Sequence, residues 1–337
     1  MSRQEAYGYC SARIRAMELR LLDAAVIQRM LDAEDIQATL KVLEETSYSA
    51  SLAAQSGGVI NYEKALEADL LATYEELRSF VPDKELVNIL RLQYDFHNVK
   101  VMLKSGFNKK EGGKQRLDLL TSLASYPVDE LVSKIETEEY ALLPYGLNLL
   151  VPQIVALWEQ NHDILEVERL LDKGLFAAML WLAHELEMPG IIAWVRAKID
   201  GENIRSLLRL KRFGYDAARA LPFLYEGGNI SVQQLAALIA EPFESWSRAL
   251  VFSDLGTVLG KIDASDNFSE LILGLEKALD EFCIEQLAKT CKGAPAAENV
   301  LAYLLKKETE IKNIRMILVS KDGKDNSQVR RLLRNAG

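Results

Sequence analysis

One polar pattern occurs three times in this chain of 337 residues and constrains the fold more than any other feature. It reads base, three residues, acid, two residues, Asn, then Val or Ile, then a second base. The base, acid and asparagine are Arg91, Asp95 and Asn98 in the first copy, Arg196, Asp200 and Asn203 in the second, and Lys306, Glu310 and Asn313 in the third. The asparagines are 105 and 110 residues apart, which predicts three copies of one unit of about domain size.

The spacing within the pattern is helical. Base and acid stand four residues apart and the asparagine follows three later, so the three side chains form one polar line along a helix. Beside this line, apolar residues recur at steps of three and four, which is typical of a helix with one face in a core. In the first copy these residues are Ile89, Leu92, Phe96, Val99 and Leu103. Gly201 and Lys307 interrupt the stripe in the later copies, which indicates divergence.

The polar line has two interpretations. In the structural one, the acid pairs with the base one turn earlier and the asparagine bonds the backbone of a neighbouring repeat. In the functional one, three lines about a pseudo-threefold axis line a common opening, and the nine residues are candidates for partner binding. We favour the structural interpretation because such pairs are common on helices.

The rest of the chain repeats around these helices. Each copy is expected to run from a short helix through a longer helix and a proline-started turn into the motif helix. The short helices are expected over 35–43, 130–135 and 234–239. The longer helices are expected to begin near Leu66, Val167 and Leu275, and the prolines are Pro82, Pro189 and Pro295.

The predicted units are 1–110, 111–213 and 214–337. Their boundaries are the charged, glycine-containing segment 109–114 and the pair Phe213 and Gly214. The first unit is expected to open with one long helix over 5–31, and the third to end in a C-terminal tail. Ser56 to Gly58 is a turn signal, and Ser231 and Gln234 form a capping-box pattern. Because no run shows strand alternation or hairpin turns, the fold class is predicted to be all-α.

Composition excludes several classes of function. The net charge is −9 and no cluster of Lys and Arg occurs, so nucleic-acid binding is not expected. Cys10, Cys283 and Cys291 have neither disulfide nor zinc-site spacing and are interpreted as small buried side chains. The first residues lack the apolar core of a signal peptide, so a cytoplasmic location is expected.

The stretch 140–158 contains no charged residue, which raises the question of a membrane span. Two prolines, a glycine and two amide side chains interrupt it, and the positive flanks of a span are missing. We therefore expect no direct span. A buried break between two helices is the preferred interpretation, and a face laid against a membrane ring is the alternative.

No catalytic, cofactor-binding or metal-binding residue is expected. The segment from Gly256 to Ile262 resembles a phosphate-binding loop, but it has three residues instead of four between the glycines, and Ile262 replaces the required Ser or Thr. His184 and Glu185 begin a helical zinc pattern, but Met188 stands where the second histidine is needed. Acids on amphipathic helices are more often solvated or paired than catalytic.

Three segments carry a resemblance to a known family. The segments 94–104, 7–15 and 308–315 together resemble the C subunit of the V/A-type rotary ATPases and ATP synthases, whose eukaryotic counterpart is the d subunit. The resemblance runs from near the N-terminus to about Leu333. It implies an all-α, funnel-like molecule of three similar helical subdomains in a pseudo-threefold arrangement.

The resemblance also implies a function. A member of this family is a non-catalytic central-stalk subunit that sits on the membrane rotor ring and receives the D/F shaft in its opening. It binds no cofactor, and the A and B subunits carry the ATP chemistry. Its role is to pass torque during proton or sodium transport, peripheral to the membrane through the ring.

Two other classes stay open at this stage. An all-helical repeat scaffold or adaptor unrelated to rotary ATPases would share the repeats but would not bind the D and F proteins of the shaft. A helical enzyme would need a buried carboxylate or histidine beside a cavity, for which the sequence offers no candidate.

Overall fold

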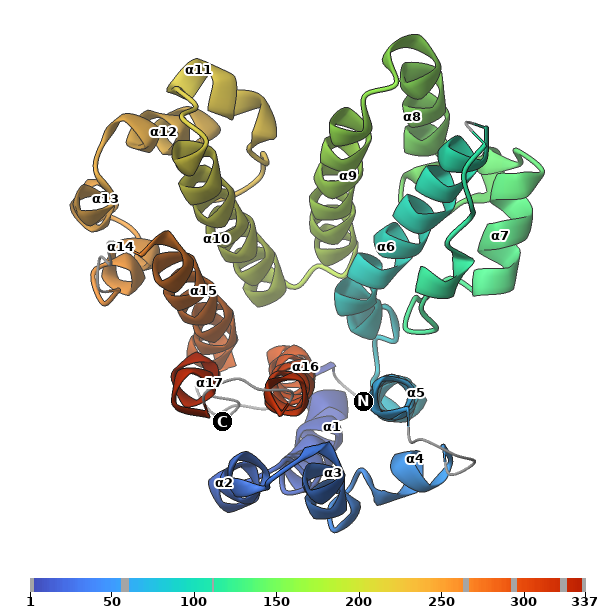
Figure 1. Cartoon of the computed structure of the whole chain (residues 1–337), viewed down its shortest axis with the longest axis vertical. Helices are drawn as coiled ribbons and strands as arrows, with labels where there is room; N and C mark the ends of the chain where they lie inside the picture. Colours follow the sequence, from blue (N-terminus) through green and yellow to red (C-terminus); the bar gives the residue numbers. More distant parts are fainter. Residues whose placement is uncertain are drawn as a thin grey trace.

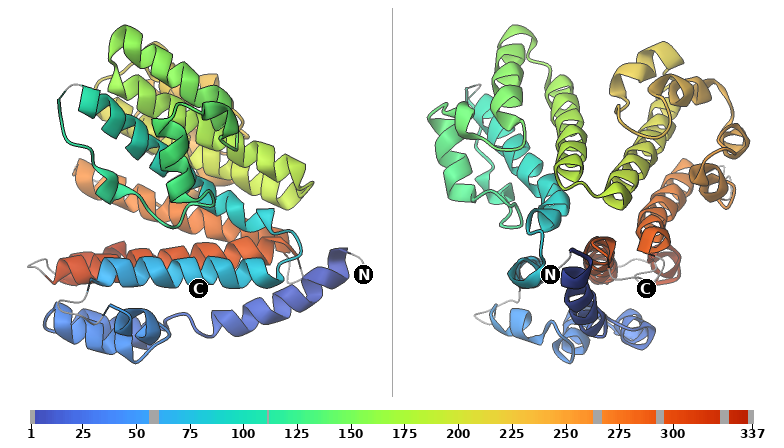
Figure 2. Two further views of the ribbon diagram at one scale, coloured as in Figure 1. Left: turned by 90° about the vertical axis from the view of Figure 1, so that its right-hand side faces the viewer. Right: turned by 180° about the vertical axis from the view of Figure 1, so that it is seen from behind.

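The computed structural model describes residues 3–55, 61–110, 112–262, 267–291, 296–321 and 326–334. Within these ranges every regular element is a helix, so the all-α prediction is confirmed. Figure 1 shows three groups of helices about a common centre, and we call them lobes 1, 2 and 3. Figure 2 shows the long helices of the lobes lying alongside one another.

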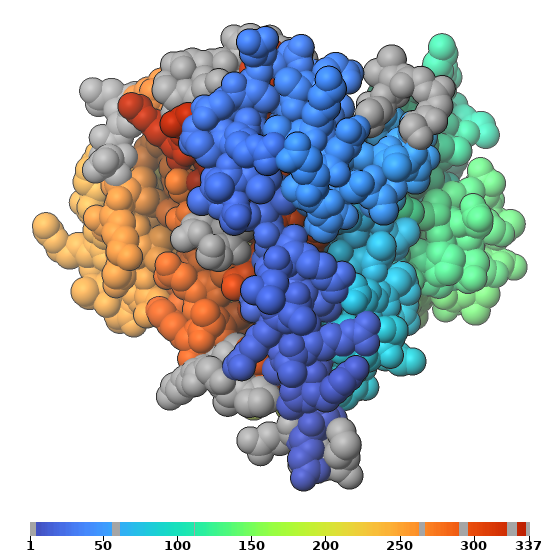
Figure 3. Space-filling model, turned by 90° about the horizontal axis from the view of Figure 1, so that it is seen from below, coloured from blue at the N-terminus to red at the C-terminus, as the bar shows by residue number. Residues whose placement is uncertain are grey.

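Lobe 1 contains both ends of the chain. It comprises α1 (Arg3–Glu18), α2 (Ala24–Asp32), α3 (Ile36–Glu44), α4 (Ser49–Ala53), α5 (Tyr62–Phe80), α16 (Glu298–Ser320) and α17 (Asn326–Leu332). In Figure 3, which views the molecule from below, α1–α4 form the outer surface of this lobe, with lobe 2 on one side and lobe 3 on the other. The C-terminal motif helix α16 packs against α1 and α5 from the N-terminal part of the chain.

Lobes 2 and 3 are each continuous in sequence. Lobe 2 comprises α6 (Glu85–Lys110), η1 (Leu117–Leu119), α7 (Val128–Glu136), η2 (Tyr140–Leu142), α8 (Leu147–Asn161) and α9 (Ile164–Glu185). Lobe 3 comprises α10 (Pro189–Arg212), α11 (Ala217–Ala220), η3 (Leu221–Phe223), α12 (Val232–Ala237), η4 (Leu238–Ala240), α13 (Phe243–Ala249), α14 (Asp254–Leu259) and α15 (Phe268–Cys291).

Each motif helix packs against the long helix that belongs to its lobe. The motif helix α6 lies on α9, α10 lies on α15, and α16 lies on α5. Ion pairs tie the first two of these helix pairs at matching places. Lys104 reaches Glu168 at 2.6 Å in lobe 2, and Arg209 reaches Glu276 at 2.5 Å in lobe 3. The sequence division at 110 and 213 stays a prediction, and the packing of α6 on α9 and of α10 on α15 crosses both of its boundaries.

The helix expected over 5–31 is instead two helices, α1 and α2. The Asp23 side chain accepts a hydrogen bond from the backbone N–H of Val26, so it caps the start of α2 and a new helix begins there. The apolar spacing continues across the break because both helices bury one face. Spacing alone therefore did not reveal the cap.

Other predicted helix-end signals are either confirmed or lie outside the described residues. Pro189 stands in the first turn of α10 as expected, and Gly214 follows that helix with a left-handed φ of 72°. The capping box of Ser231 and Gln234 is confirmed at the start of α12. The turn at 56–58 and Pro295 lie outside the described residues.

The hydrophobic core has two parts. The larger part extends over α1–α10 and α16 and includes Tyr74 and Trp194. The smaller part belongs to lobe 3, from the second half of α10 to α15, and includes Trp246 and Leu275. Lobe 3 thus buries most of its apolar side chains in a core of its own.

The uncharged stretch 140–158 forms η2, a turn and most of α8. The break predicted between two helices lies at Tyr145 and Gly146, both of which have positive φ, whereas Pro152 lies inside α8. Val151 and Ile154 are buried, but Leu142 and Leu149 are exposed, so the stretch is only partly buried. Among the described residues, no helix is both long enough and apolar enough to cross a membrane.

Candidate interaction site where the motif helices meet

The motif asparagine makes the same two hydrogen bonds in all three copies. Asn98 donates to the carbonyl of Thr121 at 2.9 Å and accepts from the N–H of the same residue at 2.9 Å. Asn203 does so with Tyr225 at 2.8 and 2.7 Å, and Asn313 with Arg334 at 2.8 and 3.0 Å. Each asparagine therefore holds the backbone of the segment that follows its own helix. The structural interpretation expected a bond to backbone, but the partner lies in the same lobe instead of in a neighbouring repeat.

The motif acid holds a second backbone position. Asp95 accepts from the N–H of Tyr126 at 2.8 Å, and Asp200 from the N–H of Ile230 at 3.2 Å. Burial raises the pKa of both carboxyls, against the opposing effect of these hydrogen bonds. In the third copy, Glu310 accepts from the N–H of Leu22, which belongs to the N-terminal segment. In the third copy, the N-terminal segment of the chain thus supplies the backbone group that the acid binds.

The motif base does not pair with the acid one turn later, which corrects that part of the structural interpretation. Arg91 donates to the carbonyls of Leu123 and Ala124 at 2.9 and 2.6 Å and pairs with Glu75. Lys306 pairs with Glu18 at 2.9 Å. Arg196 is exposed and forms no ion pair with any residue that the structure describes. Each base has a different environment because the surrounding helices differ between lobes.

The nine candidate residues are therefore arranged in three separate lines. The acids, the asparagines and Arg91 are buried within their lobes, whereas Arg196 is exposed and Lys306 is partly exposed. Their role in partner binding stays a prediction, and it now concerns mainly Arg196 and Lys306.

A different face of the motif helices meets at the centre. The residue two places after each motif base is Gln93 in α6, Lys198 in α10 and Glu308 in α16, and all three line one hollow. We call it the central hollow. Glu202 and Arg205 from α10 and Asp280 from α15 complete its polar wall. Equivalent positions of the three copies thus converge on one place.

The charges around the central hollow are paired with each other. Arg205 contacts Glu202 at 2.7 Å and Asp280 at 3.4 Å, while Asp280 also contacts Lys312 at 3.5 Å and Arg334 at 2.8 Å. Burial favours the protonated form of Asp280, but Lys312, Arg334 and Arg205 outweigh it and lower the pKa of that carboxyl. Asp280 is therefore ionised and joins α10, α15, α16 and the C-terminal segment.

Neither Lys198 nor Cys283 is activated for chemistry in this hollow. Burial opposes the charged form of Lys198, but Glu202, Cys283 and Asp280 together outweigh burial and raise the pKa, so the ammonium keeps its proton. Burial raises the pKa of Cys283 to about 11, so its thiol is protonated at neutral pH. The wall offers ions and hydrogen-bonding groups but no deprotonated thiol or free amine.

One wall of the hollow is fixed by a buried polar cluster on α16. Glu308 accepts from the hydroxyls of Tyr74 and Tyr94 and from the amide of Gln93. Burial and the neighbouring Glu308 raise the pKa of Tyr74, so its hydroxyl stays a donor. These bonds link α16 to α5 and α6.

The contacts of Lys307 explain why a charged residue interrupts the apolar stripe of the third motif helix. Its ammonium lies 2.9 Å from Asp69 and 3.0 Å from Glu310, and 4.1 Å from the centre of the Tyr48 ring. Tyr48 in turn donates to Glu310 at 2.6 Å. The buried base thus compensates the buried Glu310 and the partly buried Asp69 at the contact between α16 and the N-terminal helices.

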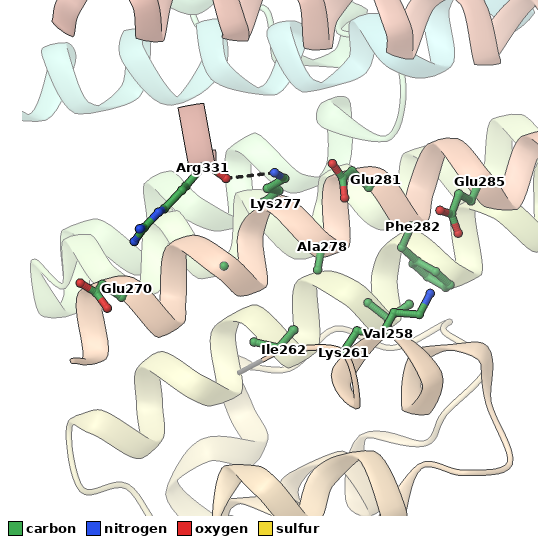
Figure 4. Close-up of a pocket in the computed structure, with 11 residues that line it drawn as sticks. Val258, Lys261, Ile262, Glu270, Lys277, Ala278, Glu281, Phe282, Glu285 and Arg331 are labelled. Carbon is green, nitrogen blue, oxygen red and sulfur yellow. Dashed lines mark hydrogen bonds between the residues drawn. The ribbon is translucent and has the colours of Figure 1, made fainter. Parts of the chain in front are cut away.

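The loop that resembled a phosphate cradle is helical. Gly256 lies within α14, and a Cβ there would be 2.3 Å from the carbonyl oxygen of Leu250, so close packing accounts for this glycine. Lys261 lines a hollow of about 520 Å³ beside α15, with Lys277 donating to the carbonyl of Arg331 (Figure 4). Three glutamates share this hollow, which does not favour a phosphate. Among the described residues, no group of three or more His, Cys, Asp or Glu could hold a metal.

A family model described as ATP synthase (C/AC39) subunit matches residues 10–332. The chain belongs to this family. It is 27% identical to the C subunit of the A-type ATP synthase of Desulfurococcus sp. (strain SY), covering 92% of this chain and 85% of that one. It is 26% identical to the C subunit of the A-type ATP synthase of Thermococcus kodakarensis, over 94% and 87% of the two chains. It is 24% identical to the C subunit of the V-type sodium ATPase of Enterococcus hirae, over 94% of each.

In this member of the ATP synthase (C/AC39) family, the residues that converge on the centre were not among those predicted from the sequence. Gln93, Lys198 and Glu308 are polar in all three copies at the same distance from the motif base. That shared polarity was a usable signal, but the three side chains differ in charge. The repeated pattern of base, acid and asparagine was more conspicuous. Its acids and asparagines form hydrogen bonds inside each lobe instead of facing the centre.

Proposed function

We propose that the chain is the non-catalytic central-stalk subunit that couples the D/F shaft to the membrane rotor ring during ATP-linked ion transport. The observation that carries the proposal is the convergence of equivalent positions of three motif helices on the central hollow, in a member of the ATP synthase (C/AC39) family. In this proposal the molecule is a cytoplasmic, funnel-like rotor part, peripheral to the membrane through the ring, and the shaft end docks against the polar residues that surround the hollow.

A torque-transmitting part must keep its shape under load, and the polar contacts support this role. Each motif helix is fastened to the following segment by an asparagine, and Asp280 joins α10, α15 and α16. The paired charges of the wall favour broad polar contact with a protein surface over a chemical step. Hence the proposed task is mechanical.

The direct test is titration of the protein with the D/F heterodimer. Lys198→Glu replaces the α10 contribution to the hollow, and we expect the affinity to fall at least tenfold at low ionic strength. Lys41→Glu makes the same charge change at an exposed site on α3 and should leave binding unaltered. The proposal is wrong if both variants bind the heterodimer like the unaltered protein.

The prediction for the motif bases needs a separate variant. Arg91 is buried and bonds two carbonyls, so changing it would disturb the fold. Arg196→Gln with Lys306→Gln leaves that contact in place. A normal melting temperature with weaker D/F binding would support partner binding by these bases, whereas unaltered affinity at two ionic strengths would leave them a structural role only.

A further inference from the structure

A second surface lies on lobe 2, on a face of α6 away from the central hollow. It is a groove of about 610 Å³ between α6, the segment 112–119 and the end of α8. Six of its lining side chains are basic or imidazole groups, and none is a carboxylate. They are His97, Lys100, Lys104, Lys114, Arg116 and His162. The chain has a net charge of −9 and three histidines, so a groove lined by six basic or imidazole groups differs in charge from the molecule as a whole.

The floor of the groove is apolar. Phe107 and Trp158 stack with ring centroids 4.6 Å apart, and Val101, Leu119 and Ile164 lie beside them. Phe107 and Trp158 are only 4% and 8% exposed, so neither offers a free ring face for stacking a nucleotide base. The groove therefore combines cations at its rim with side chains that can receive small apolar groups.

The basic groups follow the axis of α6. His97, Lys100, Lys104 and Asn108 stand three or four residues apart and form a line of roughly 16 Å on one face of that helix. The opposite wall is held in place, because Asn108 donates to the carbonyl of Lys114 and Ser105 accepts from the N–H of Arg116. These hydrogen bonds fix the segment 114–116 against α6, so this wall of the groove is formed within the chain itself.

Lys100 is held by Asp172 at 2.9 Å, with both side chains partly buried, but three other cations of the rim stay available. Lys104 pairs with Glu168 and Arg116 with Asp118, but both pairs are exposed to solvent and such pairs contribute little. Lys114 is exposed and has no ion pair with a described residue. Carboxylates of a ligand can therefore replace the internal partners at small cost.

We propose that this groove docks an acidic amphipathic helix of a partner protein, with Asp or Glu residues three or four apart toward the rim and apolar side chains toward the floor. Charge complementarity selects the acid face, and the parallel line of bases on α6 selects a helix. A flat anionic membrane fits less well, since Phe107 and Trp158 are only 4% and 8% exposed and a flat surface would not reach them. The proposal goes beyond the central hollow and does not depend on shaft binding there.

The test uses three fluorescein-labelled peptides of about 18 residues, roughly 27 Å as a helix. The first carries Glu four residues apart on one face and Leu on the other; the second replaces Glu by Gln; the third replaces Leu by Ser. We expect fluorescence anisotropy to show binding of the first peptide to the full chain, at least tenfold weaker for the other two. Equal affinity for the Glu and Gln peptides would overturn the proposal.

A matched pair of variants locates the binding. Lys104→Glu with Lys114→Glu should reduce affinity for the first peptide at least tenfold, whereas Lys41→Glu with Lys64→Glu changes net charge equally at exposed sites elsewhere and should bind normally. The same loss in both pairs would contradict a groove site. So would groove-dependent binding to vesicles of anionic lipid without peptide binding. If the groove variant fails to fold by circular dichroism, the peptide comparison on the unaltered protein still decides.

Discussion

At the scale of single residues, the motif asparagine acts as a clamp between a helix and the segment that follows it. Its amide presents an N–H donor beside a carbonyl acceptor, and in each copy this pair bonds the two backbone groups of one residue. No other side chain of that length presents both groups side by side. An aspartate there would lack the donor and would repel the carbonyl.

Replacing this asparagine by alanine tests the clamp copy by copy. We expect Asn98→Ala and Asn203→Ala to lower the free energy of unfolding by about 1–3 kcal/mol each, because a buried carbonyl and N–H lose their partner. Asn313→Ala should cost less, since Asn313 is 5% exposed whereas Asn98 and Asn203 are 0% exposed, so water can more easily replace the lost hydrogen bonds. Urea unfolding of the three variants measures the order, and equal losses in all three would contradict this account.

Asp280 gives the protein a specific dependence on acid. Its folded pKa is lowered by Lys312, Arg334 and Arg205, despite burial, so its ionised form contributes stability above pH of about 4, the pKa of an aspartate in an unfolded chain. That contribution is lost as the pH falls through the lower folded pKa. Asp280→Asn should therefore cost about 1–3 kcal/mol at pH 7 and progressively less in acid.

Urea titrations of the unaltered protein and Asp280→Asn between pH 2 and 7 measure this difference. Asp129→Asn, at an exposed site on α7, is the control and should show a small difference at every pH. A loss from Asp280→Asn that stays constant down to pH 2 would mean that its carboxylate does not supply the stability.

At the scale of elements, α16 is held in lobe 1 by charge as well as by apolar packing. Lys307→Met should lower the free energy of unfolding by about 3–5 kcal/mol, because the buried Glu310 and the partly buried Asp69 would remain without their base. Lys312→Met alters a half-exposed lysine on the same helix and should cost about 1 kcal/mol or less. Thermal melting compares the two, and similar losses would show that burial of Lys307 is unimportant.

The motif helices and the later long helices were predictable from the sequence, because periodic apolar stripes are strong signals. The predicted match of the short helix at 35–43 with those at 130–135 and 234–239 was wrong in lobe 1. The acid contacts show the true equivalents: α2, α7 and α12 each begin two residues after the backbone N–H that the acid holds. Apolar residues four apart occur in any amphipathic helix, so their spacing could not decide which helices correspond.

The central hollow was harder to predict than the helices. The pattern of polar residues shows which side of a helix avoids the core but not which helix lies opposite. Gln93, Lys198 and Glu308 are 105 and 110 residues apart and are brought together only by the packing of α6, α10 and α16. The repeated line of Asp95 and Asn98 faces instead into its own lobe, because backbone groups there need partners.

At the scale of the whole molecule, the division of the core into two parts predicts uneven stability. Lobe 3 has its own smaller core, and its outer elements α11–α14 are short helices of four to seven residues. We expect their amides to exchange with solvent at least tenfold faster than those of α6, α10 and α16. Each of these three helices also packs against a helix of a neighbouring lobe. Hydrogen exchange read by mass spectrometry measures this, and uniform protection would contradict it.

The use of both chain ends in lobe 1 has a consequence during synthesis. Tyr74 and its partner Glu308 are 234 residues apart in sequence, so at about 5–20 residues per second the ribosome needs roughly 10–50 s to deliver the acceptor after the donor. Until then the faces of α1 and α5 that receive α16 stay open to water and to other proteins. The first part made is therefore the last to be finished, and for most of that interval the growing polypeptide depends on whatever shields its exposed apolar surface in the cell.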